Sequence, residues 1–401
     1  MSATDQAYMF TQTIKAPVEH VYFAFTNATA LQQWLCNTAE IAPNQNGRIY
    51  LWWNADYATS GVVQHVEENS RLVFSWHGFG EPAPTSVEVS LTATEAATKV
   101  TIQHTGLGDD DTWQKMAETL QNDWPQALEN LVVFLEQGVD KRQYDRPMLG
   151  IFINGLLDAK QAKELGVPVA TGVVIGGVVD EMGAQKAGLQ QNDVLVGLAG
   201  EEITDFASIG NAIAAKKAGE EVPFTVYRGS EKMTLAVELG KRPFPNHPPS
   251  AAALAEQTAQ IFTELDQELD ALFAGVTDEA ASARPTSEEW SAKETVAHLI
   301  YTERWTQLNI SLIVGGQKTP GFHNDLGTIA AMADAYATTA DIVAELKRAE
   351  ATTVAAIANL SDDFVANKSR YFLLAGIPQF TPGHHRLHFQ QMQAAIQAAT
   401  N

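Results

Sequence analysis

Residues 241–250 read KRPFPNHPPS, and this stretch decides how the 401-residue chain is divided. Four of its ten residues are proline, which cannot donate the backbone hydrogen bond that a helix interior or a sheet ladder needs. We therefore expect a semi-rigid linker. A second seam is expected near 138–147, where GVDKRQYDRP follows a helical pattern. The two seams predict three domains of ordinary size, at residues 1–140, 145–242 and 251–401.

The segment after the linker is predicted to be helical almost throughout. Apolar residues recur there every three or four positions in four stretches, namely 251–273, 291–314, 329–358 and 383–399. Ser291, followed three positions later by Glu294, is typical of a capping box at the start of a helix. Four long helices of this kind predict an all-α four-helix bundle.

The segment before the linker mixes both kinds of secondary structure. Short runs typical of β-strands are predicted at 149–153, 172–179, 193–198, 223–227 and 234–239. Two helical stretches are predicted at 158–165 and 205–217. This segment is therefore expected to be a small sheet with two helices.

The first segment has the pattern of a curved antiparallel sheet that carries a long helix. Strands are predicted at 8–14, 48–53, 61–66, 71–76, 86–92 and 99–104, and helices at 18–25 and 111–136. Within 86–92, apolar and polar residues alternate, which indicates a half-buried strand. In the long helix, Trp124, Leu128 and Leu131 share one face. The whole chain is therefore predicted to be a multidomain α+β protein.

Composition excludes several classes of partner and site. The formal net charge of -22, with no basic cluster, argues against binding to nucleic acid or to an anionic membrane surface. No uncharged apolar run reaches the length of about 18 residues that a membrane span needs. The N-terminal residues lack the pattern of a signal peptide, so we expect a cytoplasmic protein. Cys36 is the single cysteine, which excludes an intrachain disulfide and a cysteine-based zinc site.

Histidines in the bundle segment suggest a metal site. His384 and His388 are four residues apart on a predicted helix, so their side chains share one face and can bind one transition metal. His298 lies in the middle of another predicted helix. A lone histidine at such a position is commonly a core residue with a satisfied hydrogen bond, and that alternative stays open on spacing alone.

A family resemblance favours the metal. The motif around His298, WSAKE followed by AHL, and the motif GHHRLHFQQM at 383–392 resemble the second and last helices of DinB-like metal-binding bundles. The resemblance covers about 251–401 and implies that His298, His384 and His388 bind a divalent metal, with zinc or nickel expected first and iron next. Three neutral imidazoles leave a coordination position open, as in catalytic or ligand-binding sites.

The same resemblance leaves the activity open. The family includes thiol S-transferases and a thiol-dependent isomerase, in which the metal activates a low-molecular-weight thiol, and also many members without a known reaction. Glu303 is either a proton-transfer candidate or a solvated or helix-pairing glutamate. His385 lies about 100° around its helix from His384 and is expected to face solvent or a neighbouring helix.

The middle segment resembles PDZ domains of the bacterial HtrA type over about 145–242. RPMLGI at 146–151 is similar to their carboxylate-binding loop, and AGLQQNDVL at 187–195 to a second motif, with Asn192 in place of the usual glycine. The resemblance implies a partly open β-barrel with two helices that binds a peptide or protein C-terminus as an added strand. The implied peptide-binding residues are Leu149, Gly150, Ile151, Phe152, Ile153, Phe206, Ile209 and Ile213. The alternative is a PDZ fold that serves as a spacer.

The first segment resembles the START-like superfamily, in the branch related to activators of the heat-shock ATPase. The matching motifs are APVEHVY at 16–22, LQQW at 31–34, RLVFSW at 71–76 and WPQAL at 124–128. The resemblance implies a helix-grip α/β sandwich with a cavity for a small apolar molecule. Its expected lining is aromatic, with plain core packing as the alternative: Trp34, Trp52, Trp53, Trp76 and Phe79.

Two functions of different classes follow from these domains. The favoured one is a cytoplasmic multidomain binding or adaptor protein that combines an apolar ligand cavity, a peptide-binding module and a divalent-metal site. The alternative is a metal-dependent thiol S-transferase or thiol-dependent isomerase whose other domains recruit the substrate. Whether the chain is an enzyme stays open on the sequence.

Overall fold

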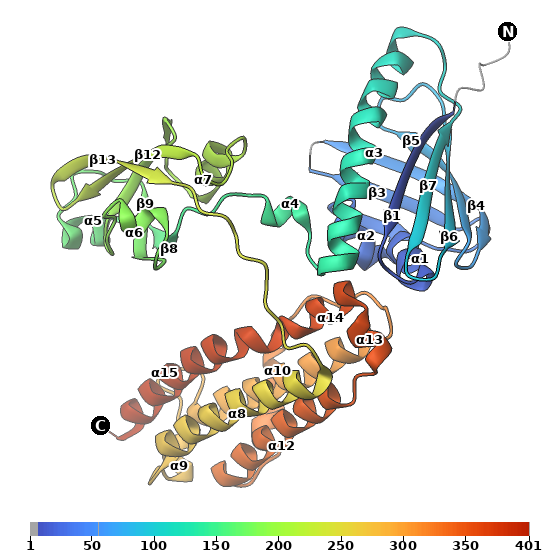
Figure 1. Cartoon of the computed structure of the whole chain (residues 1–401). Helices are drawn as coiled ribbons and strands as arrows, with labels where there is room; N and C mark the ends of the chain where they lie inside the picture. The colour runs from blue at the N-terminus through green and yellow to red at the C-terminus, as the bar shows by residue number, and fades with distance from the viewer. Residues whose placement is uncertain (1–6, 55, 401) are drawn as a thin grey trace. The chain divides into compact units, whose positions relative to one another are not determined.

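The structure is a computed structural model that describes residues 7–54 and 56–400 (Figure 1). The chain divides into two compact units, one formed by Met1–Val139 with Asn246–Asn401 and the other by Asp140–Pro245. Among the described residues, none of the helices combines the length and the apolar character needed to cross a bilayer. The parts of the chain are described one at a time.

An antiparallel sheet and a long helix build the N-terminal part. The strands run in the order β1-β7-β6-β5-β4-β3-β2. They are β1 (Tyr8–Ile14), β2 (Thr38–Ile41), β3 (Arg48–Trp53), β4 (Tyr57–Glu67), β5 (Arg71–Gly78), β6 (Thr85–Ala93) and β7 (Thr98–Thr105). The helices are α1 (Val18–Thr26), α2 (Ala28–Trp34) and α3 (Asp111–Gln137). The predicted sheet with a long helix is confirmed, whereas α2 and β2 were not predicted.

The ends of α3 follow from local chemistry. The side chain of Asp110 accepts hydrogen bonds from the backbone N–H groups of Thr112 and Trp113, which caps the start. Gly138 ends the helix with a φ of 75°, a left-handed conformation that glycine adopts without penalty. Between these ends, α3 covers one face of the sheet (Figure 1). Trp124 and Leu131 of this helix belong to the buried core.

The middle part is a second antiparallel sheet with short helices. Its strands are β8 (Ile151–Leu156), β9 (Val173–Val178), β10 (Val194–Leu198), β11 (Glu201–Glu202), β12 (Glu221–Arg228) and β13 (Glu231–Glu238). They run in the order β13-β12-β10-β9-β8, and β11 pairs with β10. The helices are α4 (Lys141–Tyr144), α5 (Ala159–Leu165), α6 (Gly183–Lys186) and α7 (Phe206–Ile213). The predicted helix at 205–217 is shorter in the structure because it ends at Ile213.

A buried ion pair stabilises this second sheet. The carboxylate of Asp193 is fully buried, and it accepts two hydrogen bonds from the guanidinium of Arg228 at 2.8 and 2.7 Å. The same guanidinium also donates to the carbonyl of Gly188 at 2.9 Å. Arg228 therefore joins the end of β12 to the turn before β10.

The C-terminal part is helical. Its long helices in the described residues are α8 (Ala251–Phe273), α10 (Ala292–Val314), α12 (Thr339–Ala358) and α15 (Thr381–Thr400). Short elements connect them, namely α9 (Asp278–Ser282), α11 (Leu326–Asp334), α13 (Asp362–Ala366), α14 (Lys368–Ala375) and the 3-10 helix η1 (Ile377–Phe380). The predicted all-α bundle is confirmed, with its apolar core between the long helices.

One helix prediction in the bundle was wrong. A single helix was expected at 329–358, but the structure has α11 and α12 with a break at 335–338. Thr338 and Asp341 form a capping box, in which each side chain bonds to the backbone of the other residue. This box starts a new helix, because it satisfies backbone N–H groups that have no partner at a helix start. The apolar periodicity continues across the break and hid it.

Candidate metal centre and binding surfaces

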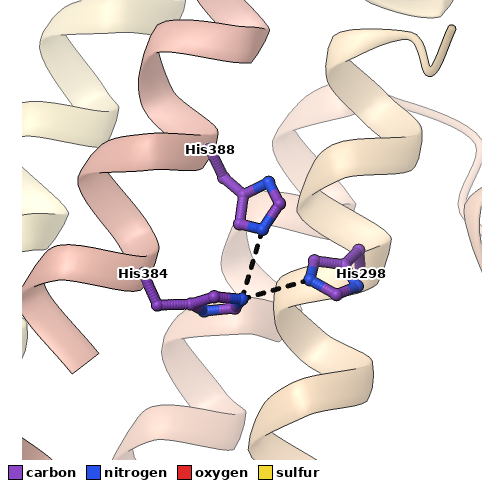
Figure 2. A group of neighbouring side chains, drawn as sticks. All are labelled: His298, His384 and His388. Carbon is purple, nitrogen blue, oxygen red and sulfur yellow. Dashed lines mark hydrogen bonds between the residues drawn. The ribbon is translucent and has the colours of Figure 1, made fainter. Parts of the chain in front are cut away.

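The three predicted histidines meet between two helices of the bundle (Figure 2). His298 projects from the middle of α10, while His384 and His388 project from one face of α15, one turn apart. His298 is buried, and the two histidines of α15 are half-buried. The spacing of four residues thus places His384 and His388 on one face of α15, as the sequence predicts. The histidines of α15 are the more exposed members of the group.

The distances fit a small metal ion. The Nε2 atom of His384 lies 3.3 Å from Nε2 of His298 and 3.2 Å from Nε2 of His388 (Figure 2). One ligand nitrogen of each ring lies within 4.8 Å of the others. Nitrogen atoms bound to one tetrahedral zinc ion at about 2.0–2.1 Å are separated by about 3.3 Å. The ring nitrogens therefore already have nearly the separation that one shared ion requires.

The imidazoles are neutral near pH 7, as metal ligands must be. Burial, followed by the repulsion of the neighbouring histidines, lowers the pKa of His298 and of His384 to about 4. Burial also lowers the pKa of His388. Because protons do not compete for the nitrogen lone pairs at neutral pH, the site is prepared for a cation.

A polar neighbour orients the ring of His388. The Nδ1 atom of His388 lies 2.9 Å from Oε1 of Gln391, an acceptor, so Nδ1 carries the proton and Nε2 keeps its lone pair. Nδ1 of His298 is buried without a hydrogen-bond partner, although the side chain of Asn324 lies near this ring. Gln391 is thus a neighbour that tunes the site, and the sequence alone gave no signal for it.

Aromatic side chains form a wall beside His298. The ring of Trp290 lies 5.1 Å from the imidazole between centroids, and that of Phe322 lies 6.2 Å away. Phe322 comes from the segment between α10 and α11 and also contacts Trp305 at 5.2 Å. These rings make the surroundings of His298 apolar on this side, although Phe322 itself is 40% exposed.

Glu303 and His385 do not belong to the group of three converging histidines, although the rings of His384 and His385 lie 6.0 Å apart between centroids. His385 is 1% exposed, and its ring packs against Phe262 of α8, so the expectation of a neighbouring helix rather than solvent is the correct alternative. Glu303 is 3% exposed and accepts a hydrogen bond from Thr353 of α12 at 2.8 Å. Glu303 is therefore a buried, helix-pairing glutamate.

The predicted peptide-binding residues surround an exposed edge strand. β8 is the last strand of its sheet, and among the described residues its outer edge pairs with no other strand. Phe152 is 60% exposed, and Phe206 at the start of α7 is 52% exposed. Ile153 is also exposed, Ile209 is buried, and the remaining apolar members, Leu149, Ile151 and Ile213, pack against the core. Such an edge can accept an added strand.

Gly150 shapes the loop in front of this strand. Its φ of 72° lies in the left-handed region, where a side chain is strained. A Cβ atom at this position would come within 2.9 Å of Cβ of Met182. Both observations require glycine, as the resemblance to a carboxylate-binding loop implies.

The aromatic residues expected to line a ligand cavity do not form one group. Trp53 and Trp76 lie together, with ring centroids 6.0 Å apart. Trp34 is 1% exposed, and its indole N–H donates to the carbonyl of Ala24 at 2.9 Å, as a core residue would. Trp52 is half-buried, and Phe79 is 81% exposed.

A polar network within the aromatic group was not predicted. The indole N–H of Trp76 donates to the hydroxyl of Tyr57 at 2.9 Å, and this hydroxyl donates to Glu81 at 2.8 Å. Burial raises the pKa of Tyr57. Nearby, His104 is bound to Thr85 at 2.8 Å and is neutral, because burial lowers its pKa to about 4. No sequence spacing links these residues.

Comparison with protein families identifies three domains in the predicted order. Residues 15–136 match the family described as activator of Hsp90 ATPase homolog 1-like protein. Residues 147–239 match the PDZ domain, and residues 230–392 match the DinB superfamily. The last match begins near β13, a strand of the middle sheet, whereas the bundle helices begin at Ala251. The chain therefore combines an Hsp90-activator-like domain, a PDZ domain and a DinB-like domain.

Curated relatives match part of the chain. A probable periplasmic serine protease do/HhoA-like from Haemophilus influenzae is 31% identical over 105 residues, which cover 26% of this chain and 22% of the relative. A probable periplasmic serine endoprotease DegP-like from Marinomonas is 29% identical over 112 residues, covering 28% of this chain and 23% of the relative. The chain thus spans about a quarter of the length of these curated relatives.

Solved structures include two that are similar to this chain over about a third of its length. An HSP90 activator from Plasmodium falciparum is 20% identical, with 32% of this chain and 96% of that chain covered and a TM-score of 0.29. The Aha1 dimer from Colwellia psychrerythraea is 22% identical, with 33% and 96% covered and a TM-score of 0.29.

Proposed function

We propose that this chain is a cytoplasmic binding protein that holds a divalent metal in its bundle and a peptide C-terminus on its PDZ domain. The observation that carries the proposal is the convergence of three neutral imidazoles, with nitrogen separations of 3.2 and 3.3 Å that suit one ion. His298, His384 and His388 would hold the ion, with zinc or nickel as the expected metals. When bound, such an ion supplies a Lewis acid with an open coordination position.

Titration of the metal-free chain with Zn²⁺ tests this part of the proposal. We expect His388→Ala to weaken zinc binding strongly, because only two ligands remain. His65→Ala is the matched control, since His65 is an exposed histidine on β4, outside the bundle. If His388→Ala and the control bind zinc equally well, the three histidines are packing residues and the proposal fails.

The proposed peptide site lies along β8. Support comes from its open edge, the exposed side chains of Phe152 and Phe206, and the left-handed Gly150 in the preceding loop. We expect a library of peptides with free C-termini to yield binders that lose affinity when the terminal carboxylate is amidated. Binding that is indifferent to amidation would contradict this site. In the first domain, the aromatic group around Trp53 and Trp76 is the proposed location for a small apolar molecule.

A thiol-dependent transferase or isomerase is the second candidate. It is favoured by the half-exposed rings of His384 and His388, which leave one side of the site accessible, and by the apolar wall of Trp290 and Phe322. A low-molecular-weight thiol would approach from that side. Addition of such a thiol to the cobalt-loaded chain should change its visible absorption spectrum. An unchanged spectrum at saturating thiol would rule out this candidate and leave a binding function.

A further inference from the structure

One turn of the first domain buries a carboxylate beside aromatic rings. Residues 79–84 read FGEPAP and join β5 to β6. Among these six described residues, only Glu81 is buried, at 8% exposed. Glutamate is rarely buried in proteins without a charged partner, because its carboxylate loses hydration. An exposed turn would be expected to keep its glutamate in solvent, so the inward position of Glu81 requires a physical reason.

Two neutral donors on the sheet hold one oxygen of this carboxylate. The hydroxyl of Tyr57 donates to Oε1 of Glu81 at 2.8 Å, and the indole N–H of Trp76 donates to the same oxygen at 3.1 Å. Gly78 makes this approach possible, since a Cβ atom there would overlap with both Tyr57 and Glu81. The carboxylate is therefore fixed in place by groups that carry no positive charge.

The other oxygen of Glu81, Oε2, is buried and has no hydrogen-bond partner in the described part of the chain. Among the described residues, no ion pair includes Glu81, and Arg71 of β5 is already paired with Glu88 at 2.7 Å. The hydroxyl Oγ1 of Thr59, which shares a face of β4 with Tyr57, is also buried without a partner. Native proteins leave few buried polar atoms in this condition, because each one costs the free energy of its lost hydration. This place therefore lacks a hydrogen-bond donor and a positive charge.

Aromatic rings adjoin the carboxylate. The ring centroids of Trp53 and Tyr57 lie 5.5 Å apart, and Trp76 lies 6.0 Å from both Trp53 and Trp124. The faces of such rings attract cations, most strongly where the cation has lost its water. Asp123 of α3 adds a second negative charge that acts on Tyr57. Charge and ring faces together favour a cation that carries an apolar body.

The turn controls access to Oε2. The other five residues of 79–84 are exposed, so moving the turn outward uncovers little new apolar surface. The carbonyl of Glu81 lies 3.1 Å from Nε2 of the exposed His77, and water can replace this hydrogen bond. Trp53 and Tyr57 are half-buried, so the aromatic rings reach the surface. Opening of the turn is therefore inexpensive, and a donor that reaches Oε2 would offset the cost of its burial.

We propose that Glu81 is the anionic anchor for a small primary amine, bound in its ammonium form. The ammonium group would donate an N–H to Oε2, and the apolar body of the amine would lie against Trp53. This inference rests on the ligand site that the proposed function gives to this domain, and it narrows the ligand from an apolar molecule to an apolar amine. A neutral ligand would leave the buried carboxylate without a counter-charge.

Calorimetric titration of the metal-free full chain with 2-phenylethylamine at pH 7 tests the proposal. The neutral probe is 2-phenylethanol, which has nearly the same shape and also donates a hydrogen bond, so the comparison isolates the charge. The wild-type chain should bind the amine about 10–100-fold more tightly, as a hydrogen bond between charged groups predicts. Glu81→Gln should remove this preference. Glu40→Gln, at an exposed position on β2, is the matched control and should keep it.

The possible results separate this inference from the proposed function. Equal or tighter binding of the alcohol overturns the inference but leaves a site for an apolar molecule. A preference for the amine that survives in Glu81→Gln also overturns it. Binding of neither probe refutes both the inference and the apolar-ligand part of the proposed function. Circular dichroism checks folding, and if Glu81→Gln is unfolded, Trp53→Leu decides: it should weaken binding of the amine more than that of the alcohol, and equal weakening would overturn the inference.

Discussion

Replacing Gly150 with alanine tests the loop that precedes the proposed peptide-binding strand. A non-glycine residue in the left-handed region, here at a φ of 72°, costs about 1–2 kcal/mol. The new Cβ atom would also lie 2.9 Å from Cβ of Met182, and overpacking of this kind costs about 1–3 kcal/mol. Together these effects predict that Gly150→Ala destabilises the PDZ domain by about 2–5 kcal/mol. They also predict weaker binding of C-terminal peptides.

Gly188→Ala is the matched control for this prediction. Gly188 has a similar φ of 84°, but a Cβ atom there would meet nothing within 4 Å, so only the conformational cost of about 1–2 kcal/mol remains. Hydrogen exchange of peptides from β8 and β9 measures the local free energy of opening. The eight tryptophans all lie outside 140–245, so tryptophan fluorescence should report an unchanged remainder of the chain. An equal loss of stability in Gly150→Ala and Gly188→Ala would refute the role of the contact with Met182.

Three further predictions concern the metal site and the buried ion pair. Gln391→Leu removes the acceptor of the His388 Nδ1 proton. Zinc binding, measured by competition with a chelator, should weaken about 10–100-fold. An unchanged zinc affinity would contradict the role of Gln391 in orienting His388. Because the folded pKa of His298 is lowered to about 4, the metal-free chain should lose stability as pH falls from about 6.5 to 4. In thermal melts, the His298→Ala variant should lose less stability over this pH range than the wild-type chain. An equal loss of stability in both would contradict this role of His298. Arg228→Met leaves the Asp193 carboxylate buried without its ion-pair partner. The free energy of local opening, measured by hydrogen exchange of β10, should fall by about 3–5 kcal/mol. A decrease below about 1 kcal/mol would contradict the stabilising role of the ion pair.

Local periodicity predicted most of the fold and the convergence of two of the three histidines of the candidate metal site. The alternation in β6 and the apolar face of α3 gave both elements nearly to the residue. The spacing of His384 and His388 placed both rings on one face of α15, since four residues make about one turn. The pairing with His298, 86 positions away, came from a family resemblance, because no local rule relates two separate helices.

The parts that the sequence did not predict depend on tertiary contacts or competing local signals. The helix expected at 329–358 is interrupted, because the capping box of Thr338 and Asp341 outweighs the continuing apolar pattern. The position of Phe322 beside His298 depends on the path of a connecting segment, which periodicity does not describe. Glu350 is 2% exposed and contacts His385 of α15, whereas its local sequence resembles an ordinary solvated helix face.

The metal content of the chain, purified without a histidine tag, tests the central claim most directly. Mass spectrometry of the wild-type chain should find bound divalent metal, and His298→Ala and His388→Ala should each lower the content by one equivalent per chain. The nitrogen separations of 3.2 and 3.3 Å lead us to expect the same loss in both variants, because the ion is shared. Metal content that is unchanged in both variants, or absent from the wild-type chain even after reconstitution with zinc or nickel, would contradict the account.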